Sequence, residues 1–173
     1  MSGDTVSYRY GRDELCALAQ VLKKPLQGID LPALNESAFH DALSTLEAAG
    51  LVTPAADRVG VDRLTALLVN EMAKCDRCAA FRSGGRATIL WQGPHLILLG
   101  TYGTRGPVSL TPLQTPDDAA EALSEALLRH PMPLTIAETG PNGPQEPQML
   151  ASKEDAEAFV TNLIDRIRRV SVF

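Results

Sequence analysis

Apolar residues recur at helical spacing in five stretches of the chain, each time on one side of the predicted helix, and this pattern predicts five amphipathic helices. Gly50 follows the second stretch as a C-terminal signal, and Asp62 stands where the N-cap of the third helix is expected. Thr115 and Ser152 offer capping hydroxyls to the fourth and fifth helices. The predicted helices cover residues 12–22, 37–49, about 62–74, 116 to about 129, and 152–168.

Between the third and fourth predicted helices, short apolar runs alternate with turns that contain glycine and proline. This is the pattern of strands joined by hairpins. Val6, Tyr8 and Tyr10 alternate with polar residues and predict an edge strand near the start of the chain. Residues 140–148, GPNGPQEPQ, predict a loop. The predicted strands cover residues 5–10, 79–83, 87–92, 95–102, 108–110 and 134–139.

This order of elements predicts an α+β fold, with an antiparallel sheet of about four strands and helices before and after it. The length of 173 residues fits a single domain over residues 1–173, and the 45% apolar content is enough for a core. A subdivision into a helical part, 1–78, and a part with the sheet and later helices, 79–173, is the alternative.

The most apolar stretch is ATILWQGPHLILLGTYG at residues 87–103, and it raises the question of what covers it. A two-residue turn at Gly93 and Pro94 would give a hairpin that is apolar on both faces. Strands of this kind usually lie in the middle of a sheet, covered on both sides by helices. The alternative is that a partner protein or a second copy of the chain covers one face or an adjoining edge. The two-residue turn places Trp91 opposite Leu96 and Ile89 opposite Leu98 on one face. In the alternative with a partner, the partner-binding residues are Ile89, Trp91, Leu96 and Leu98.

The net charge of −5 is spread evenly, because residues 1–80 hold 8 basic and 11 acidic residues and residues 81–173 hold 8 and 10. Nucleic acids and anionic membranes attract clustered positive charge, so neither is expected as the main partner. The first residues are polar, and no stretch approaches the roughly 18 apolar residues of a membrane span. We therefore expect a cytoplasmic protein.

The cysteines are few and odd in number, so no disulfide framework is expected. Cys75 and Cys78 have CxxC spacing, but a zinc site requires a second pair of ligands. A thioredoxin-like motif opens a helix after a strand, whereas this one follows a predicted helix. A structural role is favoured over metal binding or redox chemistry, and no cofactor is expected. The remaining cysteine and the widely separated histidines are Cys16, His40, His95 and His130.

Two segments are rich in glycine, RSGGR at 82–86 and TYGTRG at 101–106. A phosphate-binding loop joins a strand to the N-terminus of a helix, whereas both of these segments lead into strands. Hairpin turns are therefore the favoured interpretation. No motif that joins a nucleophile to a base is visible in the sequence, and a protein without enzymatic activity is expected.

The segment FHDALSTLEAAGLVTPAADRVGV at residues 39–61 is similar to the end of a winged-helix domain, where a helix precedes a β-hairpin wing. In that family the matching helix enters the major groove of DNA. Here residues 35–49 contain no lysine or arginine, and they carry Glu36, Asp41 and Glu47, which would repel phosphates. A winged-helix-like N-terminal part would therefore pack within the chain or bind protein.

The order of these features resembles the EspG-type chaperones of type VII (ESX) secretion over roughly residues 8–129. The similar elements are the helix RDELCALAQVL, the helix ending in LEAAGLV, the segment VGVDRLTALLVNEMAKCD, the short strands, and GPVSLTPLQTPDDAAEALSEALL. Members of that family typically have two quasi-repeated halves, and a homodimer of this chain would supply the second. The resemblance implies a cytosolic, non-enzymatic adaptor that holds helical secretion substrates through its sheet and neighbouring helices.

The expected function is therefore that of a cytoplasmic protein-binding chaperone or adaptor, whose partner is another protein or a second copy of itself. A transcriptional regulator that contains a winged helix is one alternative. The other is a small-ligand binder or an enzyme whose site is not visible in the sequence. A deep polar pocket that gathers His40, His95 or His130 with a carboxylate would favour the last alternative.

Overall fold

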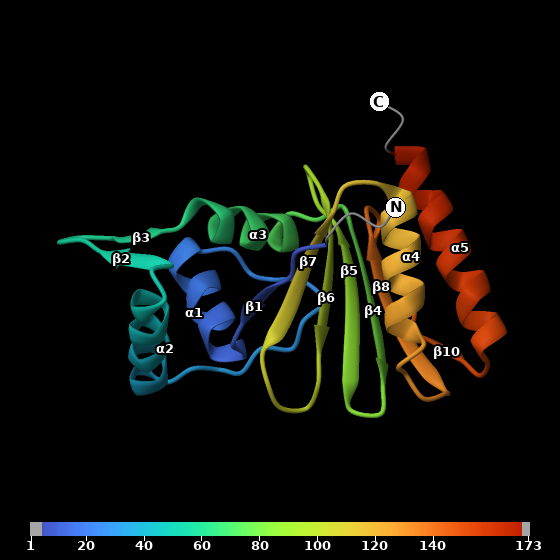
Figure 1. Ribbon diagram of the computed structural model, residues 1–173, viewed down its shortest axis with the longest axis horizontal. Coiled ribbons are helices and arrows are strands. Elements are labelled where there is room, and N and C mark those ends of the chain that lie inside the picture. Colours follow the sequence, from blue (N-terminus) through green and yellow to red (C-terminus); the bar gives the residue numbers. More distant parts are fainter. Residues whose placement is uncertain (1–4, 171–173) are drawn as a thin grey trace.

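The computed structural model describes residues 5–170 and has the expected α+β fold. Helices from the first half of the chain, an antiparallel sheet, and two helices from the second half form three layers (Figure 1). Helix starts agree with the sequence because their caps are local: the side chains of Asn35, Asp62 and Thr115 each accept a backbone hydrogen bond from the first turn. The helices of the described part are α1 (Arg12–Leu22), α2 (Glu36–Ala48), α3 (Arg63–Ala73), α4 (Pro116–Leu127) and α5 (Lys153–Val170).

Over residues 5–170 the main sheet has eight strands, not about four. Its order is β1-β7-β6-β5-β4-β8-β10, with β9 paired to β8, and these pairings are antiparallel. The predicted loop 140–148 was wrong in part, because β9 and the start of β10 lie in it. Proline is compatible with such edge positions, where one side of the backbone stays unpaired. The strands are β1 (Tyr8–Tyr10), β4 (Arg77–Ser83), β5 (Arg86–Gln92), β6 (Ile97–Tyr102), β7 (Val108–Leu113), β8 (Leu134–Gly140), β9 (Gly143–Pro144) and β10 (Gln148–Leu150).

A separate two-stranded sheet follows α2, at the place where a wing was expected. Its strands, β2 (Val52–Pro54) and β3 (Val59–Val61), pair antiparallel and project away from the rest of the molecule (Figure 1). Gly50, with a φ of +76°, adopts the left-handed conformation that ends α2. Residues 53–58 at the tip of this hairpin are exposed.

Helices of the chain itself cover both faces of the main sheet. Ile89, Trp91 and Leu98 belong to one core, which they form with α1, α2 and α3. Leu90 and Leu99 belong to the other core, which they form with α4 and α5. Because side chains alternate along a strand, the continuous apolar run of β5 contributes to both cores. The central position of the β5–β6 hairpin therefore agrees with the interpretation in which helices cover it on both sides.

The register of this hairpin differs from the prediction, because its turn spans residues 93–96 and not Gly93 and Pro94 alone. Trp91 lies opposite Leu98, and Ile89 lies opposite Gly100. The shift relative to the prediction is an even number of residues. Each side chain therefore keeps its predicted face, since the faces of a strand alternate with a period of two.

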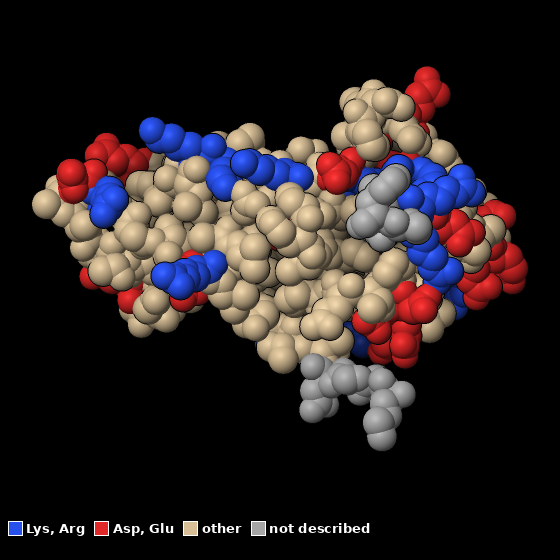
Figure 2. All heavy atoms as spheres, turned by 90° about the horizontal axis from the view of Figure 1, so that it is seen from above, with Lys and Arg blue, Asp and Glu red and all other residues tan. Residues whose placement is uncertain are grey.

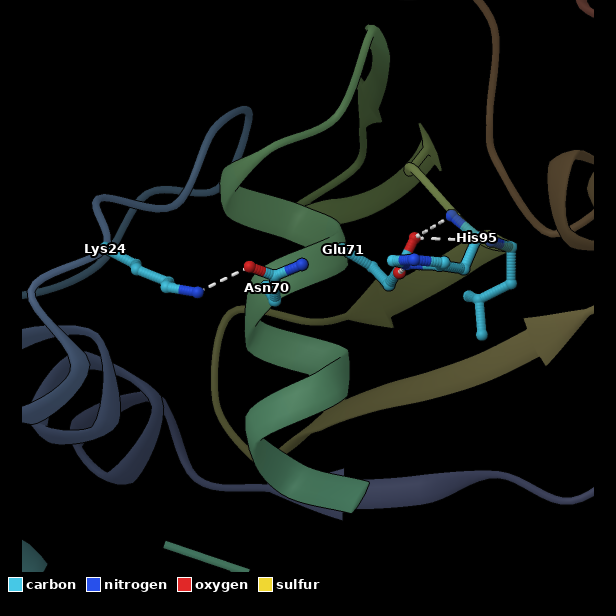
Figure 3. A network of polar contacts seen from close by, with 5 residues as sticks. Lys24, Asn70, Glu71 and His95 are labelled. Atoms are coloured by element: carbon cyan, nitrogen blue, oxygen red, sulfur yellow. Dashed lines mark hydrogen bonds and ion pairs between the residues drawn. The ribbon is translucent and has the colours of Figure 1, made fainter. Parts of the chain in front are cut away.

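A buried carboxylate on α3 holds this longer turn in place (Figure 3). Glu71 has no exposed area, and its Oε2 accepts the backbone N–H groups of His95 at 3.0 Å and of Leu96 at 3.3 Å. Its Oε1 lies 2.8 Å from Nδ1 of His95. On the preceding residue of the same helix, Asn70 accepts a hydrogen bond from Lys24. The prediction of a two-residue turn was wrong. The turn spans residues 93–96, and the carboxylate of Glu71, distant in the sequence, accepts hydrogen bonds from two of its backbone N–H groups.

Charges of both signs are mixed on the face seen from above (Figure 2). They gather over the N-terminal helices at one end and over α4 and α5 at the other, with a broad uncharged area between them. Within residues 5–170, no helix combines the length and apolar character needed to cross a membrane.

Candidate functional site

The four residues predicted to bind a partner do not form an exposed surface. Ile89, Trp91 and Leu98 have no exposed area, and Leu96 is half-buried against the same core. The indole N–H of Trp91 donates to the backbone carbonyl of Gln27 at 2.7 Å. The burial of these side chains corrects the prediction that they bind a partner, because the N-terminal helices cover the face that they share.

The CxxC motif connects the end of α3 to the start of β4. Cys78 is 2% exposed, whereas Cys75 is half-buried. A hydrogen bond between the two thiols lowers the pKa of Cys75 and raises the pKa of Cys78, and burial raises the pKa of Cys78 further. Among residues 5–170 there is no group of three His, Cys, Asp or Glu side chains that could hold a metal ion. The motif therefore offers one thiol, that of Cys75, for chemical reaction.

A cavity of about 380 Å³ lies where the β4–β5 turn, the β6–β7 turn and the C-terminal end of α4 meet, at the lower end of the sheet in Figure 1. The two turns are the glycine-rich segments 82–86 and 101–106, and they are hairpin turns as predicted. The residues that line the cavity include three arginines, three serine or threonine residues, one tyrosine and one histidine. Its volume falls at the lower end of the usual range for small-molecule pockets.

The floor of the cavity is a row of hydroxyl side chains that crosses three strands. Ser109 on β7 pairs with Thr101 on β6, and Thr101 pairs with Thr88 on β5. Paired residues point to the same face of a sheet, and α4 and α5 cover this face further along the strands. Arg9 on the edge strand β1 pairs with Ser109 and extends the row. The floor therefore combines one cation with three groups that donate or accept hydrogen bonds.

Three arginines surround this floor: Arg9 on β1, Arg86 directly after the β4–β5 turn, and Arg129 just beyond α4. All three are exposed. Within the described part of the chain none of them forms an ion pair, and no carboxylate lines the cavity. Arg129 also complements the partial negative charge at the C-terminus of α4. An anion in the cavity would therefore be attracted by three cations.

A second group of arginines shows the contrasting arrangement. Glu138 on β8 is 5% exposed, and its carboxylate lies 2.8 Å from Arg166 of α5 and 3.7 Å from Arg77 of β4. This carboxylate balances the neighbouring guanidinium groups and connects α5 to the sheet. The arginines of the cavity have no such internal partner among residues 5–170, which makes the cavity the stronger candidate for a ligand site.

His130 forms one wall of the cavity and is only 4% exposed. Its Nδ1 lies 2.8 Å from Oγ of Ser83, and its Nε2 lies 2.9 Å from Oγ1 of Thr88. Burial is the main cause that lowers the pKa of His130, and the positive charge of Arg86 lowers it further. At neutral pH the imidazole is therefore neutral, with one ring nitrogen donating and the other accepting a hydrogen bond.

The β4–β5 turn depends on two adjacent glycines. Gly84 and Gly85 have φ values of +56° and +73°, as a type I′ hairpin turn requires at both central positions. A Cβ on Gly84 would come within 2.6 Å of Pro131, and a Cβ on Gly85 within 2.9 Å of Thr104. The turn therefore packs tightly against the loops on either side and holds Arg86 at the cavity.

Tyr102 is a lining residue of the cavity, but its side chain packs on the opposite face of the sheet, against the core of the N-terminal helices. The guanidinium carbon of Arg12 lies 4.5 Å from the centre of the Tyr102 ring, and Arg12 donates to the carbonyl of Gly103. The hydroxyl of Tyr102 is buried and has no hydrogen-bond partner among residues 5–170. This unpaired buried hydroxyl is unfavourable, but it lies on the face away from the hydroxyl row and is not a donor to a ligand in the cavity.

The cavity escaped prediction because its residues come from β1, β5, β6, β7 and the segment after α4. Only a weak feature of the sequence pointed to the cavity. Thr88 and Thr101 are polar residues near the ends of apolar strands, and each lies close to a glycine-rich turn. Neither a scan against protein-family models nor a search of the curated proteins gives a match to this chain. The functional argument therefore depends on the chemistry of the cavity.

Proposed function

We propose that this chain is a binding protein for a small phosphorylated molecule, whose anionic group occupies the cavity between Arg9, Arg86 and Arg129. The observation that carries the proposal is the set of three arginines without ion pairs, within residues 5–170, around a row of hydroxyl groups. Guanidinium groups recognise phosphate oxygens through paired hydrogen bonds. A volume of about 380 Å³ leaves room for an organic group beside the phosphate.

We favour binding over catalysis because of how His130 is held. Both of its ring nitrogens contact hydroxyl groups, those of Ser83 and Thr88. In a Ser-His-Asp arrangement, one ring nitrogen instead donates to a carboxylate that orients the ring and stabilises the imidazolium. Here two hydroxyl contacts hold a neutral ring and occupy both of its nitrogens, and neither contact is with a carboxylate.

The test is an NMR titration of the labelled protein with inorganic phosphate, glycerol phosphate and glycerol, with chloride at equal ionic strength as the salt control. We expect saturable shifts of the backbone amides of Arg86, Thr88 and Gly103 with both phosphates. Glycerol phosphate should bind more tightly than inorganic phosphate, and glycerol should have no effect. A response to chloride equal to that of the phosphates would overturn the proposal.

Arginine variants locate the binding. Arg86→Gln and Arg129→Gln each remove one cation, and each should weaken phosphate binding by about tenfold. The matched control is Arg58→Gln, because Arg58 is an exposed arginine at the tip of the β2–β3 hairpin, outside the cavity. Equal losses in all three variants would show a general charge effect and not a site.

A protein-binding adaptor, as the EspG resemblance implies, is the second candidate function. The observation that favours it is the edge strand β10, which among residues 5–170 pairs on one side only and carries Met149 with 69% of its surface exposed. A strand of a partner or of a second copy can pair with such an edge. Sedimentation over a range of concentrations tests self-association. A dimer that Met149→Lys disrupts would support it, and a monomer at all concentrations would contradict it.

We also propose a cytoplasmic location for this binding protein. Cys16, Cys75 and Cys78 are free thiols, and cytoplasmic proteins keep their thiols reduced. Fractionation of host cells with an antibody to the chain tests this. Recovery in the secreted or extracellular fraction would contradict it.

A further inference from the structure

We infer that an anion in the cavity binds together with a proton on His130, so that the empty site holds a neutral imidazole and the occupied site an imidazolium. This inference depends on the proposed anion site and names the residue that adjusts its affinity. His130 is suited to the role because it is 4% exposed, lines the cavity, and contacts one member of the hydroxyl row directly.

The first reason is the hydrogen-bond geometry around His130. A neutral ring donates through one nitrogen only, so one of its two partners, Ser83 or Thr88, must donate its own hydrogen to the ring. An imidazolium donates through both nitrogens. Both hydroxyl groups then accept from the ring, and their hydrogens are free to point elsewhere. Thr88 lies in the floor of the cavity, so protonation of the ring ensures that its hydrogen is available to the anion.

The second reason is the balance of charge around the ring. Arg86 from β5, Arg129 from the end of α4 and Arg9 from β1 line the same cavity, and Tyr102 of β6 is the other titratable group there. No carboxylate of residues 5–170 lines it. In the empty cavity, burial and then the positive charge of Arg86 lower the pKa of His130. A dianion among the arginines reverses this effect and favours the imidazolium.

The sign of the pH dependence follows from this balance. Because the pKa of His130 is higher in the occupied than in the empty site, binding takes up a proton at pH values between the two. Affinity for an anion of constant charge therefore rises as the pH falls, and levels off below the pKa of the empty site. Each unit of difference between the two pKa values corresponds to about a tenfold change in affinity.

Sulfate is the probe for this test because it stays a dianion across the range in which histidine titrates, whereas phosphate changes its own charge there. We expect the affinity of the wild-type chain for sulfate to increase about threefold to tenfold between about pH 8 and about pH 5.5. Calorimetric titrations in two buffers of different ionisation enthalpy should show net proton uptake near neutral pH.

His130→Gln should bind sulfate with an affinity that no longer changes with pH. His40→Gln is the matched control, because His40 is an exposed histidine on α2 outside the cavity, and it should keep the wild-type pH dependence. Equal loss in both variants would overturn the inference. If His130→Gln does not fold, the proton uptake of the wild-type chain decides the question by itself.

The outcomes separate the two proposals. Sulfate binding without proton uptake and without pH dependence overturns the role of His130 and leaves the anion site standing. Absence of binding by both sulfate and phosphate overturns both proposals. Thr88→Val removes the hydroxyl that contacts His130. If this variant shows both less proton uptake and weaker sulfate binding, the contact between His130 and Thr88 couples protonation to anion binding.

Discussion

Glu71 on α3 accepts the backbone N–H of His95 at 3.0 Å, and through this contact a helix determines the shape of the central turn of the sheet. The same carboxylate accepts the N–H of Leu96 at 3.3 Å. Donors in a turn of this length would otherwise need water or another partner. The contact therefore connects the first half of the chain to the centre of the sheet.

Replacing Glu71 tests this connection. Glu71→Ala leaves two part-buried backbone donors of the turn unpaired, and we expect it to lower the free energy of unfolding by about 2–4 kcal/mol. Urea unfolding followed by Trp91 fluorescence measures the effect. Glu47→Ala, at an exposed position of α2, is the control and should change stability little. A small effect of Glu71→Ala would show that water satisfies the turn equally well.

Trp91 distinguishes a core position from an interface. Because its side chain has no exposed area, its emission should be that of a buried indole and should not change on dilution. Trp91→Ala should destabilise the fold by about 3–5 kcal/mol, as measured by urea unfolding with circular dichroism. An emission spectrum that depends on protein concentration would contradict the core position and would indicate that Trp91 lies at an interface.

Gly84→Ala should affect both stability and anion binding. The φ of Gly84 is +56°, and an added Cβ would come within 2.6 Å of Pro131. We expect a loss of about 1–3 kcal/mol in the free energy of unfolding and weaker sulfate binding, because Arg86 follows this turn. Gly50→Ala is the control: its φ is +76°, but nothing lies within 4 Å of the added Cβ. It should cost stability and leave sulfate binding unchanged.

The stability of the empty protein should depend on His130. The pKa of His130 is lowered from 6.5 in the folded chain, so the unfolded chain takes up this proton at a higher pH than the folded chain does. The contribution of His130 to stability is therefore present above pH 6.5 and decreases as the pH falls toward the lower folded value. In urea unfolding at about pH 7.5 and about pH 5.5, wild type should lose more stability than His130→Gln. Equal losses would contradict the lowered pKa.

Cys75 should be the reactive thiol of the CxxC motif. Its pKa is lowered from 9.0 by the hydrogen bond from Cys78, whereas Cys78 is buried with a raised pKa. Iodoacetamide should therefore label Cys75 first in the native protein and Cys78 only on unfolding, as peptide mass spectrometry would show. Cys75→Ser should remove the fast phase of labelling. Equal labelling of both thiols would contradict this order.

The sequence by itself determined the helices and the class of the fold. The capping side chains of Asn35, Asp62 and Thr115 contact residues three positions further along, and such contacts depend on local sequence alone. The alternation of side chains between two faces is also local, so the faces of the β5–β6 hairpin were predicted even though its register was not.

Only the tertiary structure decided what covers those faces and where a ligand site lies. Apolar character shows that Trp91 must leave water, but it does not distinguish the chain's own helices from a partner. The turn at 93–96 depends on Glu71, and the cavity depends on the register that brings Arg9, Ser109, Thr101 and Thr88 into one row. Contacts between residues so far apart along the chain are fixed only when the whole sheet closes between its two layers of helices, and no local pattern records them.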